Sequence, residues 1–158
     1  MTTSTRNLLS LAGWIALTAA FAVIGGLGSA SAPVFYSQLN QPDWAPPTWL
    51  FGPAWTVLYL LMAVAAWRVA HAGRGPALAV YLVQLVFNAL WSWVFFSWHM
   101  GAAAFACIVV LWLLIVATIV LFRRIDQLAA ALLLPYIGWV TFASALCYSI
   151  WQRNPGLL

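Results

Sequence analysis

The stretch from Asn40 to Tyr59 gathers side chains that are well suited to stack against a flat molecule. It reads N-Q-P-D-W-A-P-P-T-W-L-F-G-P-A-W-T-V-L-Y and holds three tryptophans and four prolines. Pro42, Pro46 and Pro47 restrict φ and lack a backbone donor, so we expect a stiff, extended frame for these rings. Two interpretations fit the pattern: an aromatic belt at the membrane interface, or the preformed wall of an apolar pocket. We favour the pocket wall, because a mere connector would use small polar residues.

Acid–base chemistry has little support in the sequence. The chain has two aspartates and no glutamate or lysine, and Asp43 and Asp126 are predicted on opposite membrane faces. His71 and His99 are expected to be separated in the same way. We therefore predict no nucleophile–base pair, no phosphate-binding loop and no metal site, and hence no acid–base catalytic residues.

The composition indicates an integral membrane protein. Of the 158 residues, 66% are hydrophobic and only 5% are charged, and the mean hydropathy is +0.99. A soluble domain carries about 25% charged residues, so this chain cannot cover a water-facing surface. Its net charge of +4 rests on arginines at the ends of apolar runs. That placement indicates membrane topology and no nucleic-acid partner.

Five apolar runs each approach the roughly 20 residues that a helix needs to cross a bilayer. We therefore predict an all-α fold, a bundle of five transmembrane helices in one domain over residues 1–158. Ala30-Ser31-Ala32 resembles a signal-peptide cleavage site, but the preceding run exceeds the usual length of about 7–15 residues, so we expect it to be retained. The predicted helices span residues 8–28, 49–70, 76–97, 102–122 and 128–151.

The arginines predict the orientation of the bundle. With an odd number of spans, the N-terminus, the second loop and the fourth loop share one side, and the other side carries only Arg153. By the positive-inside rule the N-terminus is then cytoplasmic and the aromatic loop faces out, for insertion into a bacterial-type inner membrane. The arginines on the cytoplasmic side are Arg6, Arg68, Arg74, Arg123 and Arg124.

The third helix carries two amides on an aromatic face. Gln84, Asn88, Trp91 and Phe95 are spaced by four, three and four residues, which places them on one side of a helix. An amide in hydrocarbon needs a partner, so this side should face the bundle interior. For Gln84 we favour a bond between helices, whereas Asn88 fits a structural role and a pocket role equally well.

The fifth helix carries an apolar stripe at the same spacings. Such stripes are more often packing than binding faces, but the small side chain of Ala143 leaves room for something flat beside Trp139. Near its end, Leu146-x-Tyr148-x₄-Arg153 fits a weak pattern proposed for sterol contact. The stripe comprises Tyr136, Trp139, Ala143, Leu146 and Ile150.

With these residues laid out, nearly the whole chain resembles the TspO/MBR family. That family includes tryptophan-rich sensory proteins of bacteria and the mitochondrial translocator protein, once called the peripheral benzodiazepine receptor. The segments that carry the resemblance are Pro42-x-Trp44-x-Pro46-Pro47-x-Trp49-x-Phe51, Ala54-Trp55-x₂-Leu58-Tyr59, Gln84-x₃-Asn88-x₂-Trp91-x₃-Phe95-Phe96 and Pro135-Tyr136-x₂-Trp139-x₂-Phe142-Ala143.

The resemblance implies a five-helix protein, often a homodimer, with a pocket roofed by the first loop. Members bind porphyrins such as protoporphyrin IX, haem-related tetrapyrroles, isoquinoline and benzodiazepine-type ligands and, in some cases, cholesterol. A porphyrin or haem is thus expected as a ligand, not as a covalently bound cofactor. Carried over residue by residue, the implied ligand site comprises Tyr36, Trp44, Pro46, Trp55, Tyr59, Asn88, Trp91, Trp139, Ala143 and Leu146.

One position departs from the family pattern. The family commonly has Leu-Asn in the fifth helix, whereas here Leu146 is followed by Cys147, so any hydrogen bond of that amide is not carried over. Cys107 and Cys147 both lie in apolar runs, where we expect buried thiols and no disulfide. The basic residue of the sterol pattern is displaced to Arg153, which leaves a sterol as a weak candidate partner beside membrane lipid.

Three functions remain open from the sequence. The leading one is a membrane-embedded porphyrin-binding protein that acts as a sensor, scavenger or transporter. The second is a light-dependent porphyrin-degrading enzyme, a reaction proposed in the family for the tryptophans that match Trp55 and Trp139. The third is a structural or regulatory membrane partner whose aromatic residues only anchor the bundle.

Overall fold

The computed structural model describes residues 3–73 and 75–158, so Arg74, which the predicted orientation uses, lies outside the described residues. The described chain is all-α, as predicted, and five of its helical segments are long and apolar enough to cross a membrane. The α-helices are α1 Thr3–Gly28, α2 Ala32–Gln38, α3 Phe51–His71, α4 Gly75–Ser92, α5 Gly101–Arg123, α6 Gln127–Leu132 and α7 Leu134–Arg153.

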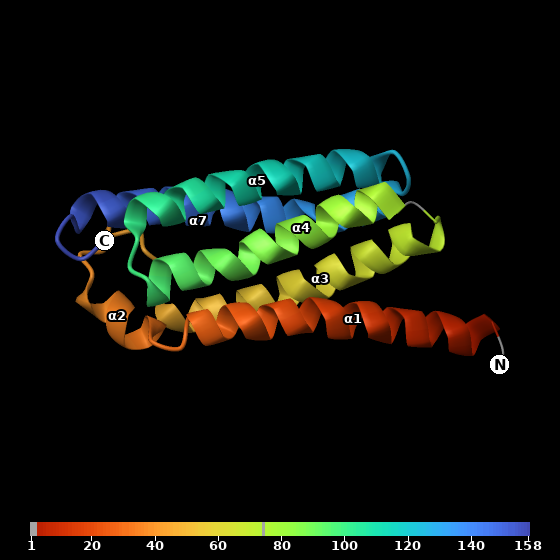
Figure 1. Cartoon of the computed structure of the whole chain (residues 1–158), viewed down its shortest axis with the longest axis horizontal. Coiled ribbons are helices and arrows are strands. Elements are labelled where there is room, and N and C mark those ends of the chain that lie inside the picture. The colour runs from red at the N-terminus through yellow and green to blue at the C-terminus, as the bar shows by residue number, and fades with distance from the viewer. Residues whose placement is uncertain (1–2, 74) are drawn as a thin grey trace.

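The long helices lie side by side, and the connections divide between the two ends of the bundle (Figure 1). The N-terminus, the connection from α3 to α4 and the connection after α5 lie at one end. Short α2 and the C-terminus lie at the other end, where the aromatic loop joins α2 to α3. Arg6, Arg68, Arg123 and Arg124 belong to the N-terminal region and to the ends of α3 and α5, so they lie at the N-terminal end of the bundle. The orientation of that end in a membrane stays a prediction.

Three local features differ from the five predicted runs. The connection 29–48 holds the unpredicted helix α2, with Pro33 in its first turn, where a missing N–H costs nothing. The predicted run 76–97 ends in a π-helical turn, Trp93–Ser97. The predicted run 128–151 is divided into α6 and α7, and Pro135 lies in the first turn of α7. A proline cannot donate the hydrogen bond that would continue α6 through this point.

The core is formed mainly by α3, α4, α5 and α7, with α1 packed against α3 and α4. Tyr81 of α4 is fully buried, and its hydroxyl lies 2.9 Å from the hydroxyl of Thr18 in α1. Trp14 of α1 meets the same ring edge-on, with the centroids 6.1 Å apart. A polar bond and an aromatic contact therefore fix α1 to the bundle near its middle.

Asp126 organises the connection between α5 and α6. Its carboxylate accepts hydrogen bonds from the backbone N–H groups of Leu128 and Ala129, 2.8 and 3.0 Å away, as a helix N-cap does. Arg68 of α3 reaches the same carboxylate, with Nη2 2.7 Å from Oδ2. The backbone bond from Ala129 and the Arg68 guanidinium lower the pKa of Asp126, so the pair persists down to mildly acidic pH.

The glycines at the end of α1 allow a close approach to α4 and its π-helical turn. A Cβ on Gly25 would lie 3.4 Å from the Cα of Ala89, and a Cβ on Gly28 would lie 2.7 Å from Trp93 Cδ1. Trp93 cannot shift freely, because its indole N–H donates to the carbonyl of Ile24 at 2.9 Å. Packing therefore requires a glycine at position 28, whereas a Cβ on Gly26 would meet no atom within 4 Å.

We predict that Gly28→Ala lowers the free energy of unfolding by about 1–3 kcal/mol, because the added methyl group overpacks against Trp93. The matched control is Gly13→Ala on the same helix, where a Cβ meets no atom within 4 Å. Thermal unfolding in a fixed detergent compares the two variants. Equal melting temperatures for Gly28→Ala and Gly13→Ala would show that the contact with Trp93 is soft.

Candidate ligand site

A cavity of about 310 Å³ lies between α1, α2, α3, α4 and α7, toward the end of the bundle that holds α2. It is lined mostly by aromatic rings and small side chains. Seven of the ten residues predicted for the ligand site line it, and they come from four different helices. These seven are Tyr36, Trp55, Tyr59, Asn88, Trp91, Trp139 and Ala143.

Three predicted residues do not line this cavity. Trp44 is half exposed and packs edge-on against Phe142, with the ring centroids 5.9 Å apart. Pro46 lies partly buried in the loop before α3. Leu146 is buried in a separate apolar cluster that includes Phe95. The proline-rich segment thus supports the end of the bundle, while other residues form the cover of the cavity.

The cover is formed by α2 and the start of α3. Tyr36 of α2 and Phe51 of α3 meet edge-on with centroids 5.9 Å apart, and both line the cavity. Behind them, the buried Asn154 at the end of α7 accepts a hydrogen bond from the backbone N–H of Asn40 at 2.8 Å. The Asn154 amide also donates to the Asn40 carbonyl at 3.2 Å. The loop is therefore tied to the C-terminal end of the bundle by side-chain bonds.

Trp139 lies at the centre of an aromatic group on the α3 and α7 sides of the cavity. Its ring meets Trp55 and Phe51 nearly at right angles, with centroids 6.5 and 6.0 Å away. Trp55 also packs against Tyr59, 5.6 Å away. Edge-to-face contacts of this kind stabilise each other's orientation and present ring faces to the enclosed space.

A chain of hydrogen bonds crosses the bundle beside the cavity. The hydroxyl of Tyr59 donates to Asn88 Oδ1 at 2.6 Å, and Asn88 Nδ2 donates to the hydroxyl of Tyr136 at 2.7 Å. Tyr136 in turn donates to Gln84 Oε1 at 2.7 Å. This chain joins α3, α4 and α7 at membrane depth, so Asn88 serves a structural role while it also lines the cavity.

Three polar atoms of the cavity wall have no hydrogen-bond partner among the described residues. They are the hydroxyl of Tyr36 and the indole N–H groups of Trp91 and Trp139. Burial raises the pKa of Tyr36, so its phenol stays protonated at neutral pH and can donate. Buried polar groups in proteins are normally paired. These three donors belong to residues of the cavity wall, and the atoms themselves are buried.

A model of the TspO/MBR family matches residues 14–152. The chain belongs to the TspO/MBR family. It is similar to "Protein CrtK" of Rhodobacter capsulatus, with 41% identity over 143 residues that cover 87% of this chain and 89% of the relative.

Two further relatives match about three quarters of this chain. The "Tryptophan-rich sensory protein" of Cereibacter sphaeroides is 46% identical over 121 residues, covering 76% of this chain and 77% of the relative. The "Translocator protein" of Homo sapiens is 32% identical over 128 residues, covering 77% and 76%. With its five long apolar helices, this TspO/MBR protein is a multi-pass integral membrane protein.

Several lining residues of this TspO/MBR protein were missed by sequence reasoning. Phe95 stacks on Trp91 with the ring centroids 5.4 Å apart, as the helical spacing predicts. The next residue, Phe96, which lies in the π-helical turn, lines the cavity. The other missed residues come from α1, α2, the start of α3 and α4: Ala22, Gly25, Gly26, Ser29, Ala32, Pro33, Thr48, Phe51, Gly52 and Ser92.

The position that departs from the family lies beside the cavity wall. Cys147 is buried next to the indole of Trp91, but Trp91 Nε1 makes no hydrogen bond of ordinary geometry to it. A thiol is a weak acceptor, whereas an amide oxygen would be a good one. Cys147 thus contributes at most a weak acceptor beside the Trp91 indole.

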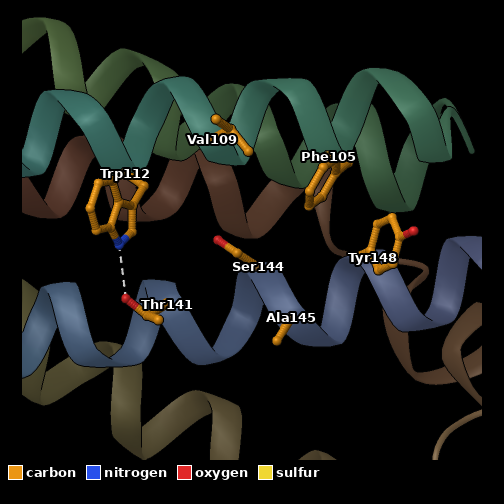
Figure 2. A pocket seen from close by; sticks show the side chains of 7 residues that line it. All are labelled: Phe105, Val109, Trp112, Thr141, Ser144, Ala145 and Tyr148. Carbon is orange, nitrogen blue, oxygen red and sulfur yellow. Dashed lines mark hydrogen bonds between the residues drawn. The ribbon is translucent and has the colours of Figure 1, made fainter.

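A second hollow lies between α5 and α7 on the outside of the bundle (Figure 2). Trp112 donates its indole N–H to Thr141 Oγ1 at 2.8 Å, and Thr141 and Ser144 donate to carbonyls of their own helix. Tyr148 borders this groove, but Leu146 of the sterol pattern is buried inside the bundle. The groove therefore offers mainly apolar surface, and the sterol pattern does not form one continuous face.

We predict that Tyr136→Phe lowers the free energy of unfolding by about 1–3 kcal/mol, since it leaves Asn88 Nδ2 and Gln84 Oε1 buried without a partner. Tyr148→Phe is the matched control, because that hydroxyl lies on a ring that is 48% exposed. Both variants are compared by thermal unfolding in the same detergent. If they behave alike, the hydrogen-bond chain contributes nothing measurable to stability.

Proposed function

We propose that this protein is a membrane-embedded binding protein for porphyrins and related tetrapyrroles, such as protoporphyrin IX or haem, and that it acts as a sensor, scavenger or transporter. The observation that carries the proposal is the cavity under α2, where rings of Trp55, Trp91 and Trp139 surround the space. Flat aromatic ligands stack on such faces. The names of its relatives, a sensory protein and a translocator, support a role in sensing or transport.

The polar atoms of the wall add a chemical preference. The unpaired donors of Tyr36, Trp91 and Trp139 favour a ligand with acceptor groups at its edge. The carboxylates of a porphyrin and the carbonyl of an isoquinoline carboxamide both meet this requirement. A flat apolar molecule without acceptors would leave the donors buried and unpaired, which costs free energy.

A light-dependent breakdown of porphyrins is the second candidate. It is favoured by the edge-to-face pair of Trp55 and Trp139 in the wall, because tryptophan side chains can exchange electrons with an excited pigment. Illuminated turnover with an identified product distinguishes it from binding. Pigment loss at the same rate with an unrelated protein would count against it.

We predict that the double variant Trp55→Ala/Trp139→Ala binds protoporphyrin IX at least about tenfold more weakly. Each lost aromatic contact removes about 0.5–1.5 kcal/mol beyond the area it buries, and 1.4 kcal/mol corresponds to a tenfold change in Kd. The titration follows porphyrin absorbance, because the substitutions remove tryptophan fluorescence.

The matched control replaces two tryptophans that do not line the cavity, Trp49→Ala/Trp98→Ala, both of which are exposed. This control should bind as the parent does. Equal affinity in the cavity variant and the control variant would reject the proposed site. Absence of saturable binding in the parent would instead favour a structural or regulatory membrane partner, for example within a homodimer.

A further inference from the structure

The cavity under α2 is small for the ligand class proposed above. Pockets for drug-sized ligands span roughly 300–1,000 Å³, and this cavity, at about 310 Å³, lies at the lower limit. It matches a molecule of two or three rings. A tetrapyrrole has four linked pyrrole rings with substituents around the edge, so it needs more space than the cavity provides. If the proposed function holds, part of the macrocycle extends beyond this volume, and the neighbouring hollows offer room for it.

A groove of about 500 Å³ adjoins the cavity on the side of α3 and α7. Its walls include Pro53 and Val57 of α3 and Pro135 and Gly138 of α7, which are exposed on the outside of the bundle. Trp139 lines both the groove and the cavity. One indole ring therefore forms part of the wall that separates the two spaces.

Trp139 is held in place by apolar contacts and by no hydrogen bond to a described residue. Its indole N–H has no hydrogen-bond partner among the described residues, so a rotation breaks no polar bond. Aromatic contacts with Phe51, Trp55 and Phe142 hold the ring. A stacked ligand can replace contacts of this kind, because any aromatic surface offers the same interaction.

The groove on the opposite side of the cavity, between α1 and α3, is a poorer candidate for holding the rest of the macrocycle. This groove of about 320 Å³ shares Ala22, Trp55 and Tyr59 with the cavity. Tyr59 is held by its 2.6 Å hydrogen bond to Asn88, so opening this side would leave two polar groups unpaired in hydrocarbon. The α3–α7 side is larger and has no such bond to break.

We propose that the α3–α7 groove is the second half of the tetrapyrrole site. The indole of Trp139 moves aside and the macrocycle takes its place. One part of the macrocycle then lies under α2 and the other part lies between Pro53 and Gly138. A ligand of two or three rings occupies only the cavity under α2. The groove thus determines which size class of ligand the protein holds, and its mouth faces the bilayer hydrocarbon.

Gly138 allows a selective test. A Cβ at this position meets no atom within 4 Å, so Gly138→Leu fills the groove without clashing with the bundle. Gly13→Leu on α1 is the matched control, because a Cβ there also meets open space and Gly13 lines neither hollow. The full-length protein is placed in lipid nanodiscs and titrated with protoporphyrin IX and, separately, with an isoquinoline carboxamide.

The expected result is a Kd for protoporphyrin IX at least tenfold weaker in Gly138→Leu, with an unchanged Kd for the isoquinoline carboxamide. Gly13→Leu should match the parent for both ligands. If Gly138→Leu binds the isoquinoline carboxamide as the parent does, that variant is folded. Parental affinity for protoporphyrin IX in Gly138→Leu would overturn the proposal, as would equal weakening of both ligands. Failure of the parent to bind protoporphyrin IX would instead reject the proposed function and, with it, this inference.

Discussion

The hydrogen-bond chain from Tyr59 through Asn88 and Tyr136 to Gln84 is the interaction on which the rest of the bundle depends. In hydrocarbon no water can satisfy these groups, so each must meet a partner from another helix. The chain fixes the rotation of α3, α4 and α7 about their axes. Once these rotations are set, Trp55, Trp91 and Trp139 are directed toward the same interior space as Asn88.

Two interruptions of regular helix shape the cavity that lies beside this hydrogen-bond chain. The π-helical turn after Ser92 moves Phe96 into the cavity wall and places Trp93 over Gly28, which closes the gap between α1 and α4. The break before Pro135 separates α6 from α7 and starts a new helix beside α3. Such departures from the α-helical ladder often occur at functional sites. Here they border the cavity and the α3–α7 groove.

The parts of this architecture that depend on local composition can be predicted from the sequence. Apolar runs of sufficient length predict the five spans, and the cost of an unpaired amide predicts that Asn88 faces inward, with Trp91 beside it. The rest depends on tertiary structure. Phe95 stacks on Trp91 as its spacing predicts, but the π turn that brings Phe96 to the cavity cannot be recognised from residue spacing. Trp44 packs on Phe142 and Leu146 is buried in the cluster with Phe95, positions set by how the loop and α7 pack against the rest of the bundle.

Two kinds of wall therefore surround the cavity. On the α1 side, Tyr59 is tied into the hydrogen-bond chain and any displacement would expose polar groups to hydrocarbon. On the α7 side, Trp139 is held by ring contacts and apolar packing without a hydrogen bond to any described residue, and Gly138 beside it leaves open space. Aromatic contacts can be exchanged for equivalent contacts with a ligand, whereas a buried hydrogen bond cannot be given up without cost. This difference makes one wall rigid and the other adaptable, because the same hydrogen-bond chain that stabilises the bundle ends before it reaches Trp139.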